Sequence, residues 1–210
     1  MKDIIIVGAS GFGREVAQWI EDINKISPIW NILGYLDDNL HALDGIIDDY
    51  QIIGSIHDWI PKSNEYFVCA IAFPKVKYEI VNLLLQKGAK FATIIHPTAN
   101  INKHVVIGEG TVVTPRSAIT SNAKIGKFTS ILGSGVGHDA VVGDFSTLSG
   151  RCSVNGHVHV GNLVYIACGV SIAPAKKIGD GATVGIGSVV ISNVKPNTTV
   201  FGNPAKRIDK

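Results

Sequence analysis

The chain has 210 residues, of which 46% are hydrophobic, and its 19 lysines and arginines nearly balance 17 aspartates and glutamates. A chain of this length and hydrophobicity accommodates two small domains, each with a core of its own. The formal charge of +2, without any run of like charges, argues against nucleic acid as a partner.

The amino terminus and the cysteines are typical of a cytoplasmic protein. The apolar run at residues 4–7 is far shorter than the core of a signal peptide or the roughly 20 residues of a membrane helix. We therefore expect no membrane insertion. Cys69, Cys152 and Cys168 have neither metal-binding nor disulfide spacing and are expected to be small core residues. The sequence predicts no metal.

Residues 1–96 alternate strand-like and helix-like segments, as an α/β layer does. A buried strand at residues 4–7 leads through a glycine-rich loop into an amphipathic helix at residues 14–23. Gly88 ends a second helix. The remaining expected elements are strands at 32–36, 66–72 and 91–95 and this second helix at 75–87. The pattern predicts a small Rossmann-like domain.

From residue 97 to residue 210 the pattern changes, because an aliphatic residue recurs every six positions. These positions are Ile101, Ile107, Val113, Ile119, Ile125 and Ile131, and then, in a new phase, Val142, Leu148, Val154, Val160, Ile166, Ile172, Ile178, Val184 and Val190. Each hexad fits one short strand and a corner, and stacked coils of three hexads bury the aliphatic column. The repeat predicts a parallel β-solenoid.

The repeat is interrupted once, between Ile131 and Val142, where the interval is eleven residues instead of twelve. The intervening segment is rich in glycine and carries His138 beside Asp139. Irregularities in a regular scaffold are candidate functional sites. A histidine titrates near neutrality and can act as a general base, so we interpret His138 as the catalytic base.

Three motifs, together with the hexads, carry a resemblance to a known family. GASGFG at residues 8–13, GHDAVVGDF at 137–145 and GNPAKRI at 202–208 resemble bacterial sugar O-acyltransferases and amino-sugar N-acetyltransferases of the NeuD and PglD type. The resemblance implies a left-handed parallel β-helix, acetyl-CoA as acyl donor, and a homotrimer with active sites between neighbouring β-helices. It also implies that Asp139 raises the basicity of His138.

The resemblance places the pantetheine arm of acetyl-CoA along backbone groups of Gly156, Cys168 and Ile186. The Gly156 amide is the candidate donor to the thioester oxygen. Lys206 and Arg207 are suited to the CoA phosphates, although a solvated basic segment explains them equally well.

The amino-terminal loop is the candidate acceptor site. Glycines between a strand and a helix let backbone N–H groups and the helix terminus hold a pyrophosphate. The candidate residues for a nucleotide-activated sugar are Ser10, Gly11, Phe12, Asp37, Asp38 and Ala72. The two aspartates end a predicted strand, where acids accept hydrogen bonds from ribose or base. Phe12 offers an apolar face. The alternative is that the glycines only form a tight turn.

The sequence therefore predicts an acetyl-CoA-dependent acetyltransferase acting on the amino group of a nucleotide-linked amino-deoxy sugar in surface polysaccharide or glycan biosynthesis. Two alternatives stay open, O-acetylation of a sugar such as sialic acid and a non-catalytic nucleotide-sugar sensor. An NAD-dependent oxidoreductase has no room for a catalytic domain, and a β-helical zinc carbonic anhydrase lacks the HxxxxH spacing.

The other histidines are assigned no role. His157 and His159 take non-inward positions of their hexad and are expected to be solvated corners instead of metal ligands. The rest lie in expected loops or at the ends of elements: His41, His57, His96 and His104.

Overall fold

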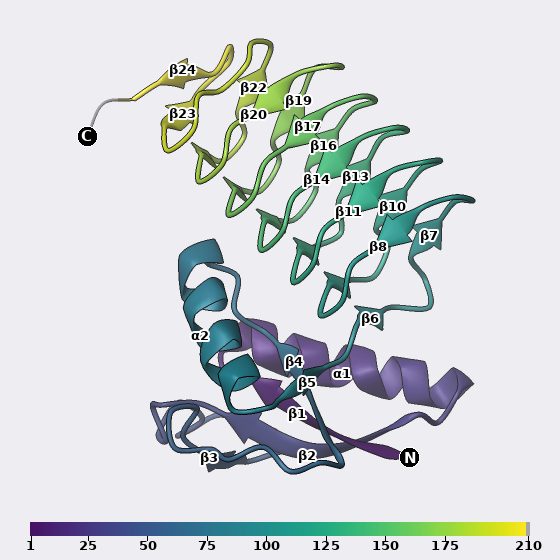
Figure 1. The fold of residues 1–210 in the computed structure, drawn as a ribbon, viewed down its shortest axis with the longest axis vertical. Helices are drawn as coiled ribbons and strands as arrows, with labels where there is room; N and C mark the ends of the chain where they lie inside the picture. The colour runs from purple at the N-terminus through teal and green to yellow at the C-terminus, as the bar shows by residue number, and fades with distance from the viewer. Residues whose placement is uncertain (209–210) are drawn as a thin grey trace. The chain divides into compact units, whose positions relative to one another are not determined.

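The computed structural model describes residues 1–208, and the chain divides into two compact units after Pro97 (Figure 1). The division lies one residue beyond the predicted boundary. Within the described residues, no helix combines the length and the apolar character needed to cross a bilayer.

The first unit is built on a parallel sheet with the strand order β3-β2-β1-β4-β5. Its strands are β1 (Lys2–Val7), β2 (Trp30–Leu36), β3 (Ile52–Gly54), β4 (Glu65–Cys69) and β5 (Lys90–Phe91), followed by the short β6 (Ile94–Ile95). Helix α1 (Gly11–Ile26) follows β1, and helix α2 (Pro74–Gln86) follows β4. The central strand β1 is fully buried over its last four residues because it has a neighbour on each side. The predicted Rossmann-like layer is confirmed.

Four details of this unit differ from the sequence prediction. The strand predicted at 66–72 is β4, which ends at Cys69. Helix α1 begins at Gly11 and ends at Ile26, so it is longer at both ends than the predicted segment. The predicted strand at 91–95 is two separate two-residue strands, β5 and β6. Strand β3 was not predicted, because it pairs only with β2 at the sheet edge and buries none of its three residues, which leaves no hydrophobic period to detect.

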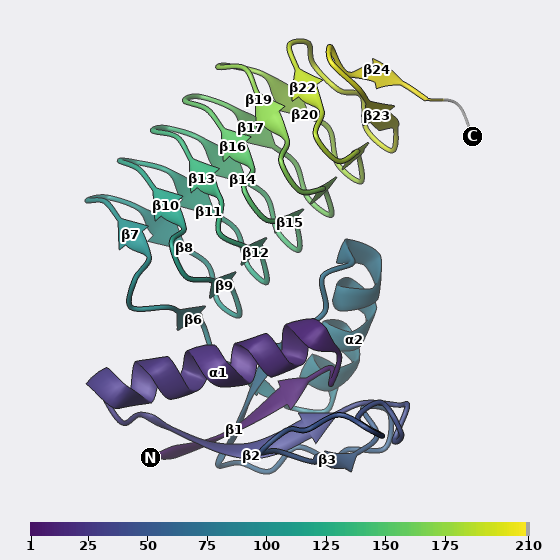
Figure 2. The same cartoon turned by 180° about the vertical axis from the view of Figure 1, so that it is seen from behind.

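The second unit is a parallel β-helix whose strands of two or three residues form three faces, seen as a stack of coils in Figures 1 and 2. The first face consists of β7 (Asn100–Ile101), β10 (Ala118–Ile119), β13 (Gly135–Val136), β16 (Ser153–Val154), β19 (Ser171–Ile172) and β22 (Val189–Val190). The second face consists of β8 (Val106–Ile107), β11 (Lys124–Ile125), β14 (Val141–Val142), β17 (His159–Val160) and β20 (Lys177–Ile178).

The third face ends in the one antiparallel pair of this unit among the described residues, formed by β23 and β24. Its strands are β9 (Val112–Val113), β12 (Ser130–Ile131), β15 (Thr147–Leu148), β18 (Tyr165–Ile166), β21 (Thr183–Val184), β23 (Thr199–Phe201) and β24 (Lys206–Arg207). The predicted aliphatic column fills the interior, and all of its members are buried except Ile101 and Ile107 in the first coil, which are half-buried. The hexad prediction is confirmed.

The missing residue of the repeat lies at a different corner from the one that carries His138. Val136 of β13 pairs with Ile119 and faces the core, five residues after Ile131. The shortened corner is therefore 132–134, whereas the corner between β13 and β14 has the regular length. The predicted loss of one residue within 132–141 is confirmed, but it does not lie at the corner of His138 and does not itself place that residue.

Candidate active site

His138 and Asp139 occupy the corner between β13 and β14, on an edge where successive coils stack. The residue at the left-handed position of this corner has a φ near 60° in five successive coils, at His104, Asn122, Asp139, His157 and Ala175. Because equivalent residues in neighbouring coils lie over one another, Asp139 stands between Asn122 of the preceding coil and His157 of the following one. The regular coil thus gathers polar side chains that are distant in the sequence.

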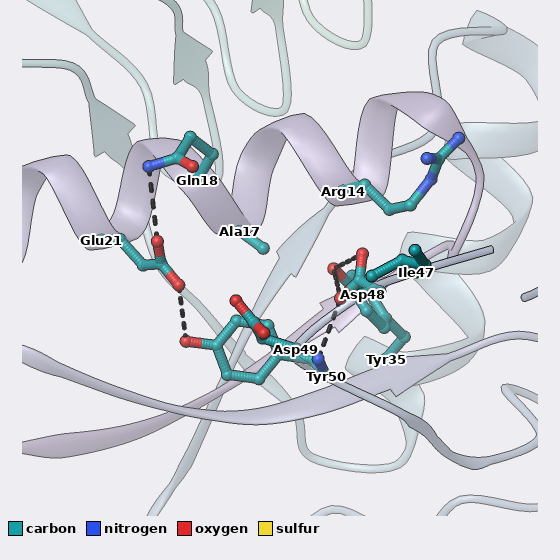
Figure 3. A pocket seen from close by; sticks show the side chains of 9 residues that line it. All are labelled: Arg14, Ala17, Gln18, Glu21, Tyr35, Ile47, Asp48, Asp49 and Tyr50. Atoms are coloured by element: carbon teal, nitrogen blue, oxygen red, sulfur yellow. Dashed lines mark hydrogen bonds between the residues drawn. The ribbon is translucent and has the colours of Figure 1, made fainter.

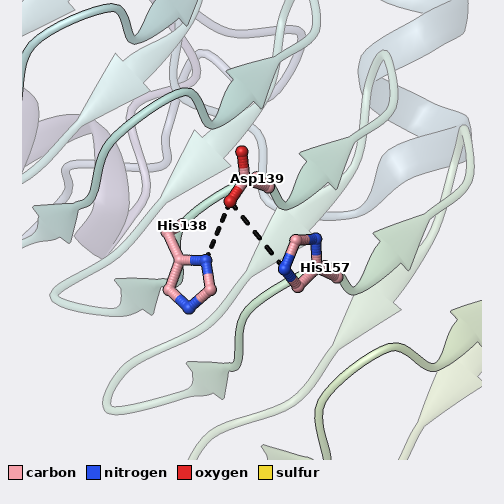
Figure 4. A group of neighbouring side chains, drawn as sticks. All are labelled: His138, Asp139 and His157. Atoms are coloured by element: carbon pink, nitrogen blue, oxygen red, sulfur yellow. Dashed lines mark hydrogen bonds and ion pairs between the residues drawn. The ribbon is translucent and has the colours of Figure 1, made fainter.

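His138 Nδ1 lies 2.9 Å from Asp139 Oδ2, and both side chains are exposed (Figure 4). This hydrogen bond holds the pKa of the Asp139 carboxyl below its usual value, and the Asn122 side chain and the charge of His157 act in the same direction. An ionised Asp139 accepts the Nδ1–H proton, which leaves the lone pair on Nε2 of a neutral ring. The pair therefore presents a histidine base with a fixed tautomer.

Gly156 lies directly against the imidazole of His138. A Cβ atom at Gly156 would stand 2.6 Å from His138 Nε2 and 2.7 Å from Cε1, closer than any side chain tolerates. The glycine also has a backbone N–H for which no acceptor is found among residues 1–208. A histidine base and an unpaired amide donor thus stand side by side, which is the combination that acyl transfer requires.

The amino-terminal unit forms a cavity of about 310 Å³ at the carboxyl ends of β1, β2 and β4. The sheet order reverses between β1 and β4, and open α/β sheets bind ligands at this position. The cavity is lined by five of the six predicted acceptor residues, Ser10, Phe12, Asp37, Asp38 and Ala72, together with Gly8, Ile56, Ala70, Ile71, Phe73, Val76 and Ile80. The sixth, Gly11, is exposed at the start of α1.

Comparison with known proteins places this chain in a known family. Residues 3–84 match the PglD N-terminal domain. GDP-perosamine N-acetyltransferase of Escherichia coli O157:H7 is 30% identical over 98% of this chain and 96% of its own length. The chain belongs to the PglD-like family of sugar acetyltransferases.

Two solved structures extend over nearly the whole of this PglD-like chain. WeeI from Acinetobacter baumannii AYE is 33% identical, with a TM-score of 0.87 over 99% of this chain and 100% of its own. PerB from Caulobacter crescentus, solved with CoA and GDP-perosamine, is 22% identical and shares the fold, with a TM-score of 0.89 over 100% of this chain and 98% of its own. The second unit of this acetyltransferase is a left-handed parallel β-helix.

The predicted acetyl-CoA residues of this PglD-like chain are not all brought together within one chain. Gly156 stands beside His138, but Cys168 and Ile186 lie on a different edge of the β-helix, following β18 and β21. Both are exposed, so the expectation that Cys168 is a core residue was wrong. Lys206 and Arg207 form β24, and Arg207 lines a cavity of about 230 Å³ that also contains Lys195.

The glycines of the amino-terminal loop have separate roles. Gly8 has a φ of 103°, and a Cβ atom at Gly13 would stand 1.9 Å from the Gly8 carbonyl oxygen, so both are needed for the turn and for close packing of α1. Gly11 has no such requirement, because the nearest atom to a Cβ added there would be Arg14 Nη2, at the ordinary distance of 3.8 Å. The tight-turn interpretation accounts for Gly8 and Gly13 but leaves Gly11 open to a ligand.

Asp37 and Asp38, which line the cavity, form hydrogen bonds that hold the surrounding loops in place. Asp37 Oδ2 accepts a hydrogen bond from the Ala9 N–H at 2.9 Å, which ties the end of β2 to the glycine loop. Asp38 accepts hydrogen bonds from Ser55 Oγ at 2.7 Å and pairs with His57 Nδ1 at 2.7 Å. His57 was assigned no role, and no sequence signal identifies it because 19 residues separate it from Asp38.

His157 was likewise assigned no role from the sequence. Its ring is exposed, as expected, but its Nε2 atom lies 3.9 Å from Asp139 Oδ2, and its ring stands perpendicular to that of His138 with centroids 5.0 Å apart. The nitrogen and oxygen atoms of His138, Asp139 and His157 that could bind a metal all lie within 4.8 Å of one another, and all three side chains are exposed. Acetyl transfer from a thioester to an amine needs a base and a donor to the oxyanion, and it requires no metal.

A second cavity of the amino-terminal unit, of about 160 Å³, lies between α1 and residues 47–50 (Figure 3). Its polar groups largely satisfy one another, since Tyr50 Oη donates to Glu21 at 3.0 Å and Tyr35 Oη donates to Asp48 at 3.1 Å. Burial raises the pKa of Tyr50 to about 12, and its hydrogen bond to Glu21 acts in the same direction. This cavity is a structural polar network that anchors the loop to the helix.

Proposed function

We propose that this chain transfers the acetyl group of acetyl-CoA to the amino group of a nucleotide-linked amino-deoxy sugar, in glycan or surface-polysaccharide biosynthesis. The observation that carries the proposal is the position of His138, whose Nδ1 is bound by Asp139 and whose Nε2 lies against Gly156. These groups supply a base and an oxyanion donor at one point.

The reaction follows from these two groups. His138 Nε2 takes a proton from the sugar amine as its nitrogen attacks the thioester carbonyl carbon, which typically contributes a factor of about 10² to 10⁴ in rate. The Gly156 N–H donates a hydrogen bond to the oxyanion of the tetrahedral intermediate. The carbon–sulfur bond then breaks, and the proton on His138 passes to the CoA sulfur. Asp139 stabilises the imidazolium between these steps.

The amino-terminal unit, residues 1–96, is proposed to bind the nucleotide-linked sugar. The relative of known activity acts on GDP-perosamine, which is a nucleotide-linked amino sugar. The cavity at the strand ends combines the first turn of α1, where N–H groups favour phosphate, with the apolar side chains of Phe12 and Phe73. An apolar wall suits a deoxy sugar better than a fully hydroxylated one.

Residues 97–210 are proposed to bind acetyl-CoA and to form a homotrimer. Gly156 lies on the edge that carries His138, whereas Cys168 and Ile186 lie on another edge of the same β-helix. One thioester arm can contact both sets when two copies stand side by side, so the site is proposed to be completed by a neighbouring subunit. The exposed apolar side chains of Val106 and Ile186 support such a contact. The cytoplasm is the proposed location.

The test is release of the CoA thiol from acetyl-CoA in the presence of GDP-, UDP- or dTDP-linked amino sugars, with the matching hydroxy sugars and free sialic acid as controls. We expect thiol release with one class of nucleotide-linked amino sugar and none with its hydroxy counterpart. Acetylation of sialic acid alone would replace the proposal by O-acetylation. Absence of turnover, with a nucleotide sugar raising the melting temperature, would favour a sensor.

Gly11→Val tests binding of the nucleotide-linked sugar separately from binding of acetyl-CoA. The fold leaves room for a side chain at this exposed helix start. Valine there is expected to obstruct the pyrophosphate and raise the acceptor KM several-fold, without changing the KM for acetyl-CoA. An unchanged acceptor KM would exclude the glycine loop as the phosphate site.

A further inference from the structure

Arg14 places a positive charge at the start of a helix, where the backbone already carries partial positive charge. It lies in the first turn of α1, which contains no acidic residue, and the Ser10 side chain forms no capping hydrogen bond. The Arg14 N–H donates to the Ser10 carbonyl oxygen at 3.1 Å, so the three N–H groups before it have no acceptor within the helix. A cation is unfavourable at this end of a helix, because it adds to the positive end of the helix dipole. The placement is favourable only with an anion beside it.

The Arg14 side chain has no partner within the protein that offsets this placement. In the described part of the chain its guanidinium forms no hydrogen bond or ion pair, and its Nε is buried without a hydrogen-bond partner. Buried polar groups are nearly always hydrogen-bonded, so an exception calls for an explanation. The nearby Asp48 carboxylate instead accepts a hydrogen bond from Tyr35. Figure 3 shows the guanidinium at the opposite end of this cavity from Glu21. A structural ion pair therefore does not explain Arg14.

The end of the Arg14 side chain lies beside the glycine loop of the acceptor site. A Cβ atom added to Gly11 would stand 3.8 Å from Arg14 Nη2, and Gly11 is otherwise exposed. Ser10 and Phe12, the neighbours of Gly11 in the chain, both line the cavity of about 310 Å³ that is proposed to bind the nucleotide-linked sugar. The charge that lacks a partner in the protein is thus next to the residues at which the acceptor is proposed to bind.

We propose that Arg14 binds the diphosphate of the acceptor and selects nucleoside diphosphate sugars over sugars without a diphosphate. The start of a helix is equivalent to only about half a positive charge, which is less than a diphosphate requires. A guanidinium adds a full charge, and its N–H donors match the geometry of phosphate oxygens. This inference rests on the proposed function of the amino-terminal unit and names the group that recognises the acceptor class.

Three variants separate the charge, the shape and the net charge of the helix. Arg14→Gln removes the charge and keeps a polar side chain. Arg14→Lys keeps the charge but replaces the planar guanidinium by a single ammonium group. Lys25→Gln is the matched control, because it removes a positive charge from the last turn of the same helix, where Lys25 pairs with Asp22 at 2.8 Å. Thermal unfolding shows whether each variant is folded.

The measurement is the Kd of UDP, GDP or dTDP, whichever carries the accepted sugar, compared with the Kd of the corresponding nucleoside. Both are followed by NMR titration, which reaches millimolar affinities. We expect Arg14→Gln to raise the Kd of the nucleoside diphosphate about 10- to 100-fold, because a charge-assisted hydrogen bond is lost, and to leave that of the nucleoside nearly unchanged. Arg14→Lys should give a smaller increase, and Lys25→Gln should bind both ligands as the wild type does.

Two results of this comparison would overturn the inference. An unchanged Kd for the diphosphate in folded Arg14→Gln would show that Arg14 does not contact the ligand. An equal loss of affinity for the diphosphate and the nucleoside would show that Arg14 only shapes the loop.

A second measurement uses the wild type and does not depend on the folding of Arg14→Gln. The guanidinium N–H signal of Arg14, assigned from its absence in Arg14→Lys, should shift when the nucleoside diphosphate is added and should not shift with the nucleoside. A signal that the diphosphate leaves in place would also overturn the inference.

The inference and the proposed function fail in different ways. If the wild type binds none of the three nucleoside diphosphates and acetylates only a free sugar, the nucleotide-linked acceptor is wrong, and the role of Arg14 is wrong with it. If the wild type binds one of them and Arg14→Gln binds it equally well, only the inference about Arg14 is wrong.

Discussion

Gly156→Ala tests the placement of the catalytic base with the smallest possible change. The added Cβ would stand 2.6 Å from His138 Nε2, 2.7 Å from Cε1 and 3.2 Å from Cδ2, so the imidazole must rotate away. The backbone of Gly156 is not in the left-handed region, so alanine fits the local conformation. The substitution also keeps the amide N–H that is proposed to bind the oxyanion, and it therefore isolates the position of the ring.

The expected effect is on kcat and not on folding. A displacement of a catalytic group by about 1 Å costs a factor of about 10² in rate. The clash is relieved by a side chain on the surface, so the melting temperature should not fall, and a glycine-to-alanine change at a compatible position even stabilises by about 0.4 to 1 kcal/mol. The assay is thiol release at saturating acetyl-CoA, with thermal unfolding measured in parallel.

Gly135→Ala is the matched control, in strand β13, which leads into the corner of His138. A Cβ atom there meets only the Cys152 carbonyl oxygen, at the ordinary distance of 3.9 Å. We expect this variant to retain wild-type turnover. A folded Gly156→Ala variant whose kcat stays within twofold of wild type would contradict this prediction. It would show that catalysis does not depend on the ring of His138 lying against Gly156.

Three further predictions concern charge, burial and packing. Asp139→Asn should lower kcat and move the acidic limb of the kcat/KM profile to lower pH, because the lost carboxylate, whose own pKa is held below its usual value by the hydrogen bond to His138, no longer favours the proton on that ring. An unchanged profile would leave Asp139 a structural residue. Burial lowers the pKa of Lys77 to about 7, so the unfolded chain binds more protons than the folded one between pH 7 and about 10, and stability should rise with pH across that window. Lys77→Met should remove this rise and increase the free energy of unfolding at pH 7, measured with urea, by up to about 4 kcal/mol. If the unfolding free energies of the variant and the wild type depend on pH in the same way, the prediction is wrong. Gly13→Ala should reduce the yield of folded protein or lower its melting temperature, because its Cβ would stand 1.9 Å from the Gly8 carbonyl oxygen; wild-type stability by circular dichroism would contradict this.

The hexad period predicted the β-helix because one physical requirement, an inward aliphatic side chain, recurs in every strand. The same regularity also determines which residues of successive coils stack at one corner. One coil of three hexads is 18 residues, and residues 18 apart stack at the same corner. Gly156 lies one coil after His138, and His157 lies one coil after Asp139. Counting residues in this way would have placed Gly156 and His157 beside the catalytic pair.

Other features depend on contacts that no local period records. The one-residue deletion follows Ile131, because Val136 keeps its pairing with Ile119, and the hexad count alone cannot assign the deletion to one corner. In the amino-terminal unit, alternating strands and helices brought the loop after β1 and Asp37 to one sheet edge as predicted. The pairing of Asp38 with His57 depends on the path of an irregular segment and could not be predicted.

The most direct test of the account compares His138→Asn with the wild type in acetylation of the accepted nucleotide-linked amino sugar, together with acetyl-CoA binding by calorimetry. Asparagine keeps a polar side chain at the corner but cannot take the proton. The account predicts that kcat falls by about 10² or more while the Kd for acetyl-CoA stays within a few-fold. Turnover within a few-fold of the wild type, in a variant that binds acetyl-CoA normally, would contradict it.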